Sequence, residues 1–119
     1  MKIKLKKNPR KFIVGMNKKN KIKLFDCGQI LLKPNEQISF ITESLSTHDV
    51  TRKKWGFYAT QSINSRLKKR FKTAIVINQI NRIFIMLVEK KHLKEFNKYC
   101  KTENQRVLIW LDDLKYEKL

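Results

Sequence analysis

The stretch that decides the fold is TAIVINQINRIFIMLVE, residues 73–89. Two apolar runs, 73–78 and 82–89, are joined by the segment NQIN, and this pattern predicts a β-hairpin. Both runs are apolar on both of their faces. Strands of that kind are buried on both sides, so we expect the hairpin to lie centrally in a sheet.

The segments that follow this hairpin predict a helix and one more strand. Residues 90–101 have the spacing of a helix with Leu93 and Phe96 facing inward, and residues 106–111 are apolar. A strand, a helix and a strand in this order suggest a right-handed crossover. We therefore expect strand 106–111 to run parallel to strand 82–89.

The segments that precede the hairpin, up to residue 59, predict one short helix and several strands. Asn8 followed by Pro9 is typical of a helix start, which predicts a short helix ending near Met16. Residues 22–41 are expected to form strands with a turn at residues 33–36, where Pro and Asn favour turn geometry. Residues 48–59 are expected to form one long strand.

Residues 62–71 are expected to form a helix, because Ile63, Leu67 and Phe71 recur every four residues. The predicted fold is α+β: a single small domain over residues 1–119, with a mixed but mostly antiparallel sheet and about three short helices. Its parts are a β-rich middle, the central hairpin 73–89 and a C-terminal β-α-β arrangement. Residues 1–7 are expected to be a basic arm, either flexible or an edge strand.

The net charge of +18 comes from 28 basic and 10 acidic residues, and it is unevenly placed. Residues 1–23 hold ten basic groups and no acid, and residues 52–72 hold eight and no acid. Such a field attracts polyanions, of which nucleic acid is the commonest. A different explanation is codon bias, because Lys, Ile and Asn, all with AT-rich codons, supply 44 of the 119 residues.

The candidate site is the basic aromatic stretch RKKWGFYATQSINSRLKKRFK, residues 52–72. Cations would contact phosphates and aromatic rings would stack on bases, which is how proteins hold RNA or another single strand. We expect Tyr58, and after it Trp55, to stack on bases, and Phe57 to belong to the core. The predicted nucleic-acid or anion-binding residues are Arg52, Lys53, Lys54, Trp55, Tyr58, Thr60, Ser62, Asn64, Arg66, Lys68, Lys69 and Arg70.

Two other functions fit the same sequence. One is a domain, or an accessory enzyme, that holds a small anion such as a sugar phosphate or a nucleotide between Tyr58 and Arg66, at the start of the predicted helix. The other is a structural subunit of a homo-oligomer, in which one apolar face of the hairpin is buried.

The sequence favours binding over catalysis and predicts no catalytic residue, metal or cofactor. Cys27 and Cys100 match neither a disulfide framework nor zinc spacing, and no Gly-rich phosphate loop occurs. Asp112 and Asp113 follow an apolar strand, where Mg²⁺ ligands can lie, but we interpret them as charges that close a buried strand. The longest apolar run, Ile83–Val88, is too short to span a bilayer, so we expect a cytoplasmic protein without a membrane partner.

Overall fold

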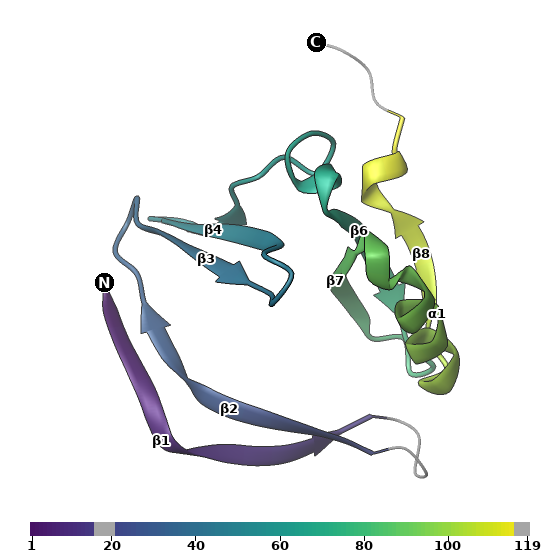
Figure 1. Ribbon diagram of the computed structural model, residues 1–119, viewed down its shortest axis with the longest axis horizontal. Helices are drawn as coiled ribbons and strands as arrows, with labels where there is room; N and C mark the ends of the chain where they lie inside the picture. Colours follow the sequence, from purple (N-terminus) through teal and green to yellow (C-terminus); the bar gives the residue numbers. More distant parts are fainter. Residues whose placement is uncertain (16–20, 116–119) are drawn as a thin grey trace. The chain divides into compact units, whose positions relative to one another are not determined.

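The computed structural model describes residues 1–15 and 21–115, and most of these residues lie in strands (Figure 1). The chain divides into two compact units. Unit 1 comprises Met1–Ser39 and Asp49–Thr60, and unit 2 comprises Phe40–His48 and Gln61–Leu119. The α+β class and the antiparallel sheets agree with the prediction.

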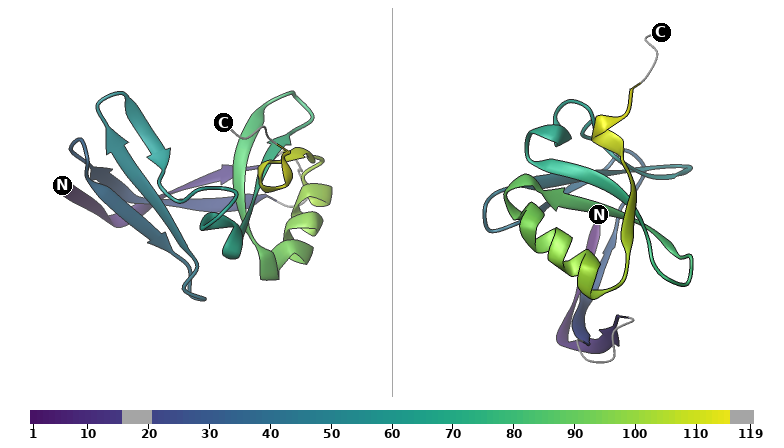
Figure 2. Two further views of the ribbon diagram at one scale, coloured as in Figure 1. Left: turned by 90° about the horizontal axis from the view of Figure 1, so that it is seen from above. Right: turned by 90° about the vertical axis from the view of Figure 1, so that its right-hand side faces the viewer.

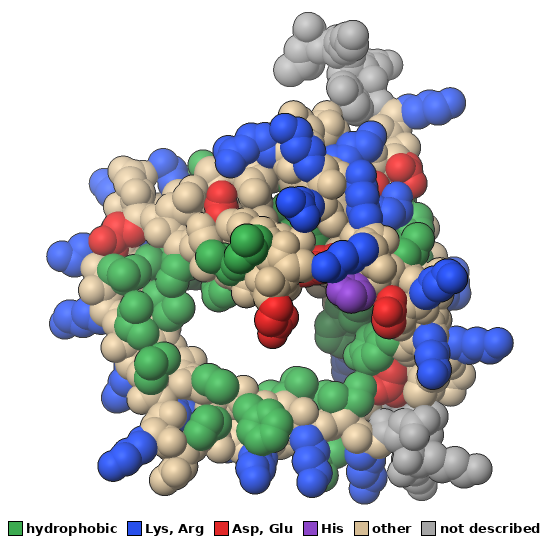
Figure 3. Space-filling model, in the orientation of Figure 1, with side chains coloured by type: hydrophobic (Ala, Val, Ile, Leu, Met, Phe, Trp, Pro, Cys, Tyr) green, Lys and Arg blue, Asp and Glu red, His purple; other side chains and the backbone are tan. Residues whose placement is uncertain are grey.

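Unit 1 contains a long two-stranded ribbon. Strand β1 (Lys2–Val14) pairs antiparallel with β2 (Ile22–Leu31), and the register shifts between Leu5 and Arg10. The predicted edge strand at residues 1–7 is thus part of β1. Lys and Arg side chains lie along one side of this ribbon and hydrophobic side chains along the other (Figure 3).

The helix predicted to begin at Asn8 and Pro9 is wrong, because these residues belong to β1. They lie in the interval where the register shifts, a place where a strand tolerates proline. Lys6 and Arg10, on either side of Asn8 and Pro9, both pair with Asp26 of β2, at 2.6 and 3.8 Å. Pairing with a distant strand therefore overrides the local helix-start signal.

A second sheet has the order β3-β4-β5, formed by β3 (Gln37–Ile41), β4 (Thr47–Lys53) and β5 (Gly56–Ala59). The single strand predicted for residues 48–59 is wrong, because the chain reverses at Lys54 and Trp55. Gly56 allows this reversal with a φ of 149°, which side chains rarely adopt. The predicted turn at residues 33–36 is confirmed: Asn35 has a φ of 70°, and the Glu36 N–H donates to the Lys33 carbonyl at 3.1 Å.

Unit 2 contains the predicted hairpin, but only one of its two strands is central. Strand β6 (Phe71–Ile77) pairs antiparallel with β7 (Ile83–Glu89) and with β8 (Arg106–Trp110), so the order is β7-β6-β8. β7 and β8 run in the same direction, as predicted, but β6 lies between them. Only β6 is central; β7 is an edge strand.

Helix α1 (Leu93–Thr102) lies against one face of this sheet (Figures 1 and 2). Its Phe96 ring meets the Trp110 ring of β8 edge-on, with centroids 5.7 Å apart. Ala74 and Val76 of β6 are fully buried, so the core of unit 2 lies around the central strand.

In the part of the chain that the structure describes, α1 is the one α-helix, so the prediction of about three is too high. The helix predicted over 62–71 is wrong: this segment consists of turns and a 3-10 helix, η1 (Leu67–Lys69). The Ser62 backbone carbonyl accepts from both the Ser65 and Leu67 N–H groups, so the segment closes as a turn, and serine and asparagine are common in turns. Two further 3-10 helices are η2 (Lys90–His92) and η3 (Leu111–Asp113).

Among the described residues, no helix is long and apolar enough to cross a membrane.

Candidate nucleic-acid interface

The β4–β5 hairpin carries the aromatic half of the predicted site. Arg52 pairs with Phe57 and Thr51 with Tyr58, and Lys54 and Trp55 form the tip. All of these residues belong to unit 1. The hairpin is thus a short, hydrogen-bonded scaffold for the side chains that it presents.

The aromatic rings of this hairpin are exposed. Trp55, Phe57 and Tyr58 show 71, 61 and 42% of their surface to solvent. The Trp55 and Tyr58 rings lie 6.0 Å apart between centroids and tilt by 31°, so they form one aromatic cluster at the tip. The expectation that Phe57 is a core residue is wrong, and the hairpin therefore offers three rings where we expected two.

Three cations accompany these rings. The Arg52 guanidinium lies 5.8 Å from the centroid of the Phe57 ring, and the Lys53 ammonium donates to Asn35 Oδ1 at 2.7 Å. Lys54 is exposed at the tip. Arg52 Nη1 is buried and has no hydrogen-bond partner among the described residues, so it is a donor without an acceptor. We define the aromatic hairpin as Arg52, Lys53, Lys54, Trp55, Phe57 and Tyr58.

A polar network holds the base of the aromatic hairpin. Thr51 Oγ1 is hydrogen-bonded to Thr60 Oγ1 and to Gln37 Oε1, and the Thr60 N–H donates to the Asp49 carbonyl at 2.9 Å. Ser39 Oγ donates to Asp49 Oδ1 at 2.6 Å. Thr60, which the sequence analysis assigned to ligand binding, is therefore engaged in holding the hairpin.

The remaining predicted site residues lie in unit 2, in the turn segment 61–70. Arg66, Lys69 and Arg70 line a cavity of about 240 Å³, together with Leu45, Thr47, Gln61, Leu67 and Phe71. Ser62, Asn64 and Lys68 are exposed and do not line it. The structure thus brings the predicted residues together as two groups, one in each unit.

The predicted anion site at a helix start is not supported. No α-helix begins at Ser62, and the three-residue η1 has no side-chain cap. Such sites depend on the free N–H groups of the first helical turn and on peptide dipoles aligned over several turns, and a three-residue 3-10 helix does not provide this combination. What remains for an anion is the group of three cations around the small cavity.

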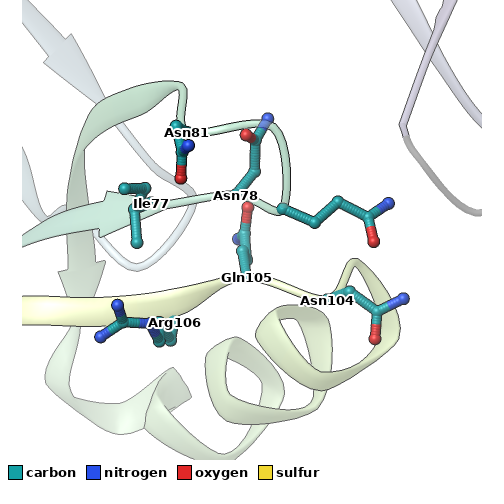
Figure 4. A pocket seen from close by; sticks show the side chains of 7 residues that line it. Ile77, Asn78, Asn81, Asn104, Gln105 and Arg106 are labelled. Atoms are coloured by element: carbon teal, nitrogen blue, oxygen red, sulfur yellow. The ribbon is translucent and has the colours of Figure 1, made fainter.

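A third group of polar side chains surrounds a cavity of about 450 Å³ in unit 2 (Figure 4). It lies between the β6–β7 turn and the turn from α1 into β8. Carboxamides and one guanidinium line it, and sequence analysis did not single it out, although Asn and Gln are concentrated in both turns. The lining residues are Ile77, Asn78, Gln79, Asn81, Asn104, Gln105 and Arg106.

Cys100 and the aspartate pair have structural surroundings, whereas Cys27 is exposed. Cys100 is buried, and this burial raises the pKa of its thiol. Asp112 and Asp113 accept from the Lys72 ammonium at 3.0 and 3.4 Å. No group of three or more His, Cys, Asp or Glu side chains suited to a metal occurs among the described residues.

Comparison with known proteins gave no relative: no family model, curated protein or solved structure matches this chain.

Proposed function

We propose that this protein binds single-stranded nucleic acid, RNA in particular, through the aromatic hairpin. The observation that carries the proposal is the exposure of three rings beside three cations on one short hairpin. Exposed aromatic rings offer a face to any base, and neighbouring cations offer charge to the backbone. This is the arrangement that single strands need and that duplexes, with stacked bases, cannot use.

The geometry of the rings supports stacking. Trp55 and Tyr58 are close enough to act as one platform, and Phe57 already holds a cation over its face. Since Thr51 and Thr60 fix the base of the hairpin, little ordering accompanies binding. The ten basic residues of segment 1–23 add long-range attraction without reading sequence.

The test is a titration of a mixed-sequence RNA of about 12 nucleotides, a length within the usual site size, over a salt series. Tyr58→Ala should weaken binding about tenfold, because one base–aromatic contact is worth roughly 1–3 kcal/mol. Lys54→Ala should reduce the slope of log affinity against log salt by about one phosphate contact.

Two variants in unit 2 are matched controls. Tyr99 is exposed to nearly the same degree as Tyr58, at 39 against 42%, and Lys101 is an exposed lysine of α1. Tyr99→Ala and Lys101→Ala should leave affinity and slope nearly unchanged. Equal effects of Tyr58→Ala and Tyr99→Ala would show that charge alone, and not the aromatic hairpin, drives binding.

A second candidate function is binding of a small anion such as a sugar phosphate. It is favoured by the three cations that line the cavity of about 240 Å³. One guanidinium group can donate two parallel hydrogen bonds to two oxygens of a phosphate. Arg66 and Arg70 both line this cavity. We expect ribose 5-phosphate to shift the amide resonances of segment 61–71, and Arg66→Ala with Arg70→Ala to abolish the shift.

The exposed Lys68 provides the control for this candidate, because it lies in the same segment outside the cavity lining. Lys68→Ala should retain the response to ribose 5-phosphate. A response that disappears equally with Lys68→Ala would indicate diffuse attraction to charge rather than a site.

A further inference from the structure

A groove runs along the outer edge of β7 beside α1. Its lining includes Met86–Glu89, four consecutive residues of β7, and it encloses about 520 Å³. Consecutive strand residues point to opposite faces of a sheet. A cavity that touches all four therefore reaches the edge of the strand, where the main chain is accessible.

The main chain of β7 has pairing capacity at this edge. β7 is hydrogen-bonded to β6 on one side, and no other strand of the described chain pairs with it. Ile83 and Ile85 of the same strand remain 61 and 68% exposed. An exposed apolar edge is a ready template for one more strand, and several peptide-binding domains use such an edge beside a helix.

The groove also has a defined chemistry. Its walls combine apolar side chains from the strand with the Phe96 and Tyr99 rings of α1. Two carboxylates, Glu89 and Glu95, belong to the lining, and it contains neither lysine nor arginine. In a chain with a net charge of +18, such a lining is complementary to an apolar group that carries a positive charge.

The carboxylates are held in place. Ser44 Oγ donates to Glu89 Oε2 at 3.0 Å, and the His92 imidazole lies 3.5 Å from Glu89 and 3.6 Å from Glu95. Hydrogen bonds from the hydroxyl groups of Thr42 and Ser44 lower the pKa of Glu89, and the bond from Thr42 has the larger effect. Burial acts in the opposite direction but does not outweigh them. Glu89 is thus ionised at neutral pH and oriented before any ligand arrives.

We propose that this groove binds an extended peptide of a partner protein, which adds a strand to the free edge of β7. An apolar side chain of the peptide enters between β7 and α1, and a neighbouring lysine or arginine pairs with Glu89 and Glu95. Lys91 of η2 and Lys94 of α1 are neighbours in sequence of residues that line the groove, but they do not line it themselves. This function is separate from the aromatic hairpin of unit 1.

The test uses a fluorescein-labelled peptide that alternates lysine and isoleucine, KIKIKIK, followed by anisotropy with the full chain. We expect saturable binding and, in hydrogen exchange, protection of alternate β7 amides. Glu95→Lys should weaken binding at least tenfold. Glu43→Lys, an exposed change of the same charge outside the groove, should not.

A backbone-methylated peptide completes the experiment. Methyl groups on alternate peptide nitrogens remove the donors that strand addition needs, so this peptide should not bind. Equal binding of the methylated peptide would overturn strand addition and indicate a pocket for a small organic cation. Equal weakening by Glu95→Lys and Glu43→Lys, or no binding by the parent peptide, would also contradict the proposal.

Discussion

Asp112 is a buried carboxylate that joins the end of β8 to β6. Its Oδ1 accepts from the Thr73 N–H at 2.9 Å, and its Oδ2 accepts from the Lys72 ammonium at 3.0 Å. The same ammonium lies 4.9 Å from the centroid of the Trp110 ring. One side chain thus ties η3 to the central strand of unit 2.

Removal of the Asp112 carboxylate should lower the free energy of unfolding far more than removal of the neighbouring Asp113 carboxylate. Asp112→Ala leaves the Thr73 N–H without its acceptor and leaves the partly buried Lys72 with only the exposed Asp113 as an ionic partner. We therefore expect a loss of about 2–3 kcal/mol from the free energy of unfolding. Asp113 is exposed, so Asp113→Ala should cost no more than about 0.5 kcal/mol. Urea denaturation followed by tryptophan fluorescence measures both; equal losses would contradict this role of Asp112.

Lowering the pH should reduce the stability of the protein through the same carboxylate, Asp112. Burial raises the pKa of Asp112, but the hydrogen bonds from Thr73 and Lys72 outweigh it, and the net result lies below the ordinary value of 3.8. A depressed folded pKa gives stability that is present above pH 3.8 and is lost as pH falls through the folded value. Asp112→Asn should therefore show a flatter loss of stability below pH 4 than the parent protein.

Among single residues, the sequence predicted stacking rings at Trp55 and Tyr58, which the structure shows to be exposed, but it wrongly placed Phe57 in the core. Alternation along an assumed long strand put Phe57 on the same face as Trp55 and Ala59, and a large apolar side chain on a strand is usually buried. The reversal at Lys54 and Trp55 ended that strand early, and Phe57 came to face solvent. Exposure depends on packing partners, which a single sequence does not reveal.

Among the elements, those with dense local signals were predictable. The β6–β7 hairpin combines two apolar runs with a short connection, and the turn at residues 33–36 has both Pro34 and Asn35 in favourable positions. Helix α1 has a clear apolar stripe. In each of these cases local preference and tertiary pairing lead to the same structure.

The wrong predictions concern elements in which the local sequence preference conflicts with pairing to a distant strand. Asn8 and Pro9 look like a helix start, but β2 offers β1 a partner along most of its length. Ile63, Leu67 and Phe71 have helical spacing, yet Phe71 is the first residue of β6. Arg10 pairs with Asp26 and Phe71 with Glu89, which are 16 and 18 positions away, so a pattern read over a few helical turns does not contain either partner.

Gly28 and Gly56 allow a prediction at the scale of single elements. Both have a φ near 150°, but a Cβ on Gly28 would lie 2.2 Å from the Lys4 carbonyl oxygen, whereas a Cβ on Gly56 would meet nothing within 4 Å. Gly56→Ala should cost about 1–2 kcal/mol from backbone strain alone. Gly28→Ala should cost about 3 kcal/mol or more, because the β1–β2 ribbon must open there.

Hydrogen exchange separates these two effects. Gly28→Ala should speed exchange of β1 and β2 amides while β6 amides, in unit 2, stay protected. Gly56→Ala should act on β4 and β5 only. If the β1 and β2 amides were equally protected from exchange in Gly28→Ala and Gly56→Ala, this result would contradict the close approach of Lys4 to Gly28.

For the whole molecule, the charge of +18 is not spread evenly over the structure. The lysines of β1 and β2 lie on a ribbon of unit 1, and Arg66, Lys69 and Arg70 belong to unit 2. Composition predicted an attraction for polyanions, but only the structure shows that exposed rings accompany the cations of one hairpin. The central claim is that these rings stack on bases.

The measurement that tests this claim most directly compares two ligands of equal charge: an oligouridylate of about 12 nucleotides and an abasic phosphodiester of the same length. Tryptophan fluorescence reports stacking on Trp55, and Trp55→Phe identifies its share of the signal apart from Trp110. We predict that the oligouridylate quenches Trp55 and binds about tenfold or more tightly than the abasic chain. Equal affinity for both ligands without quenching of Trp55 would contradict the account.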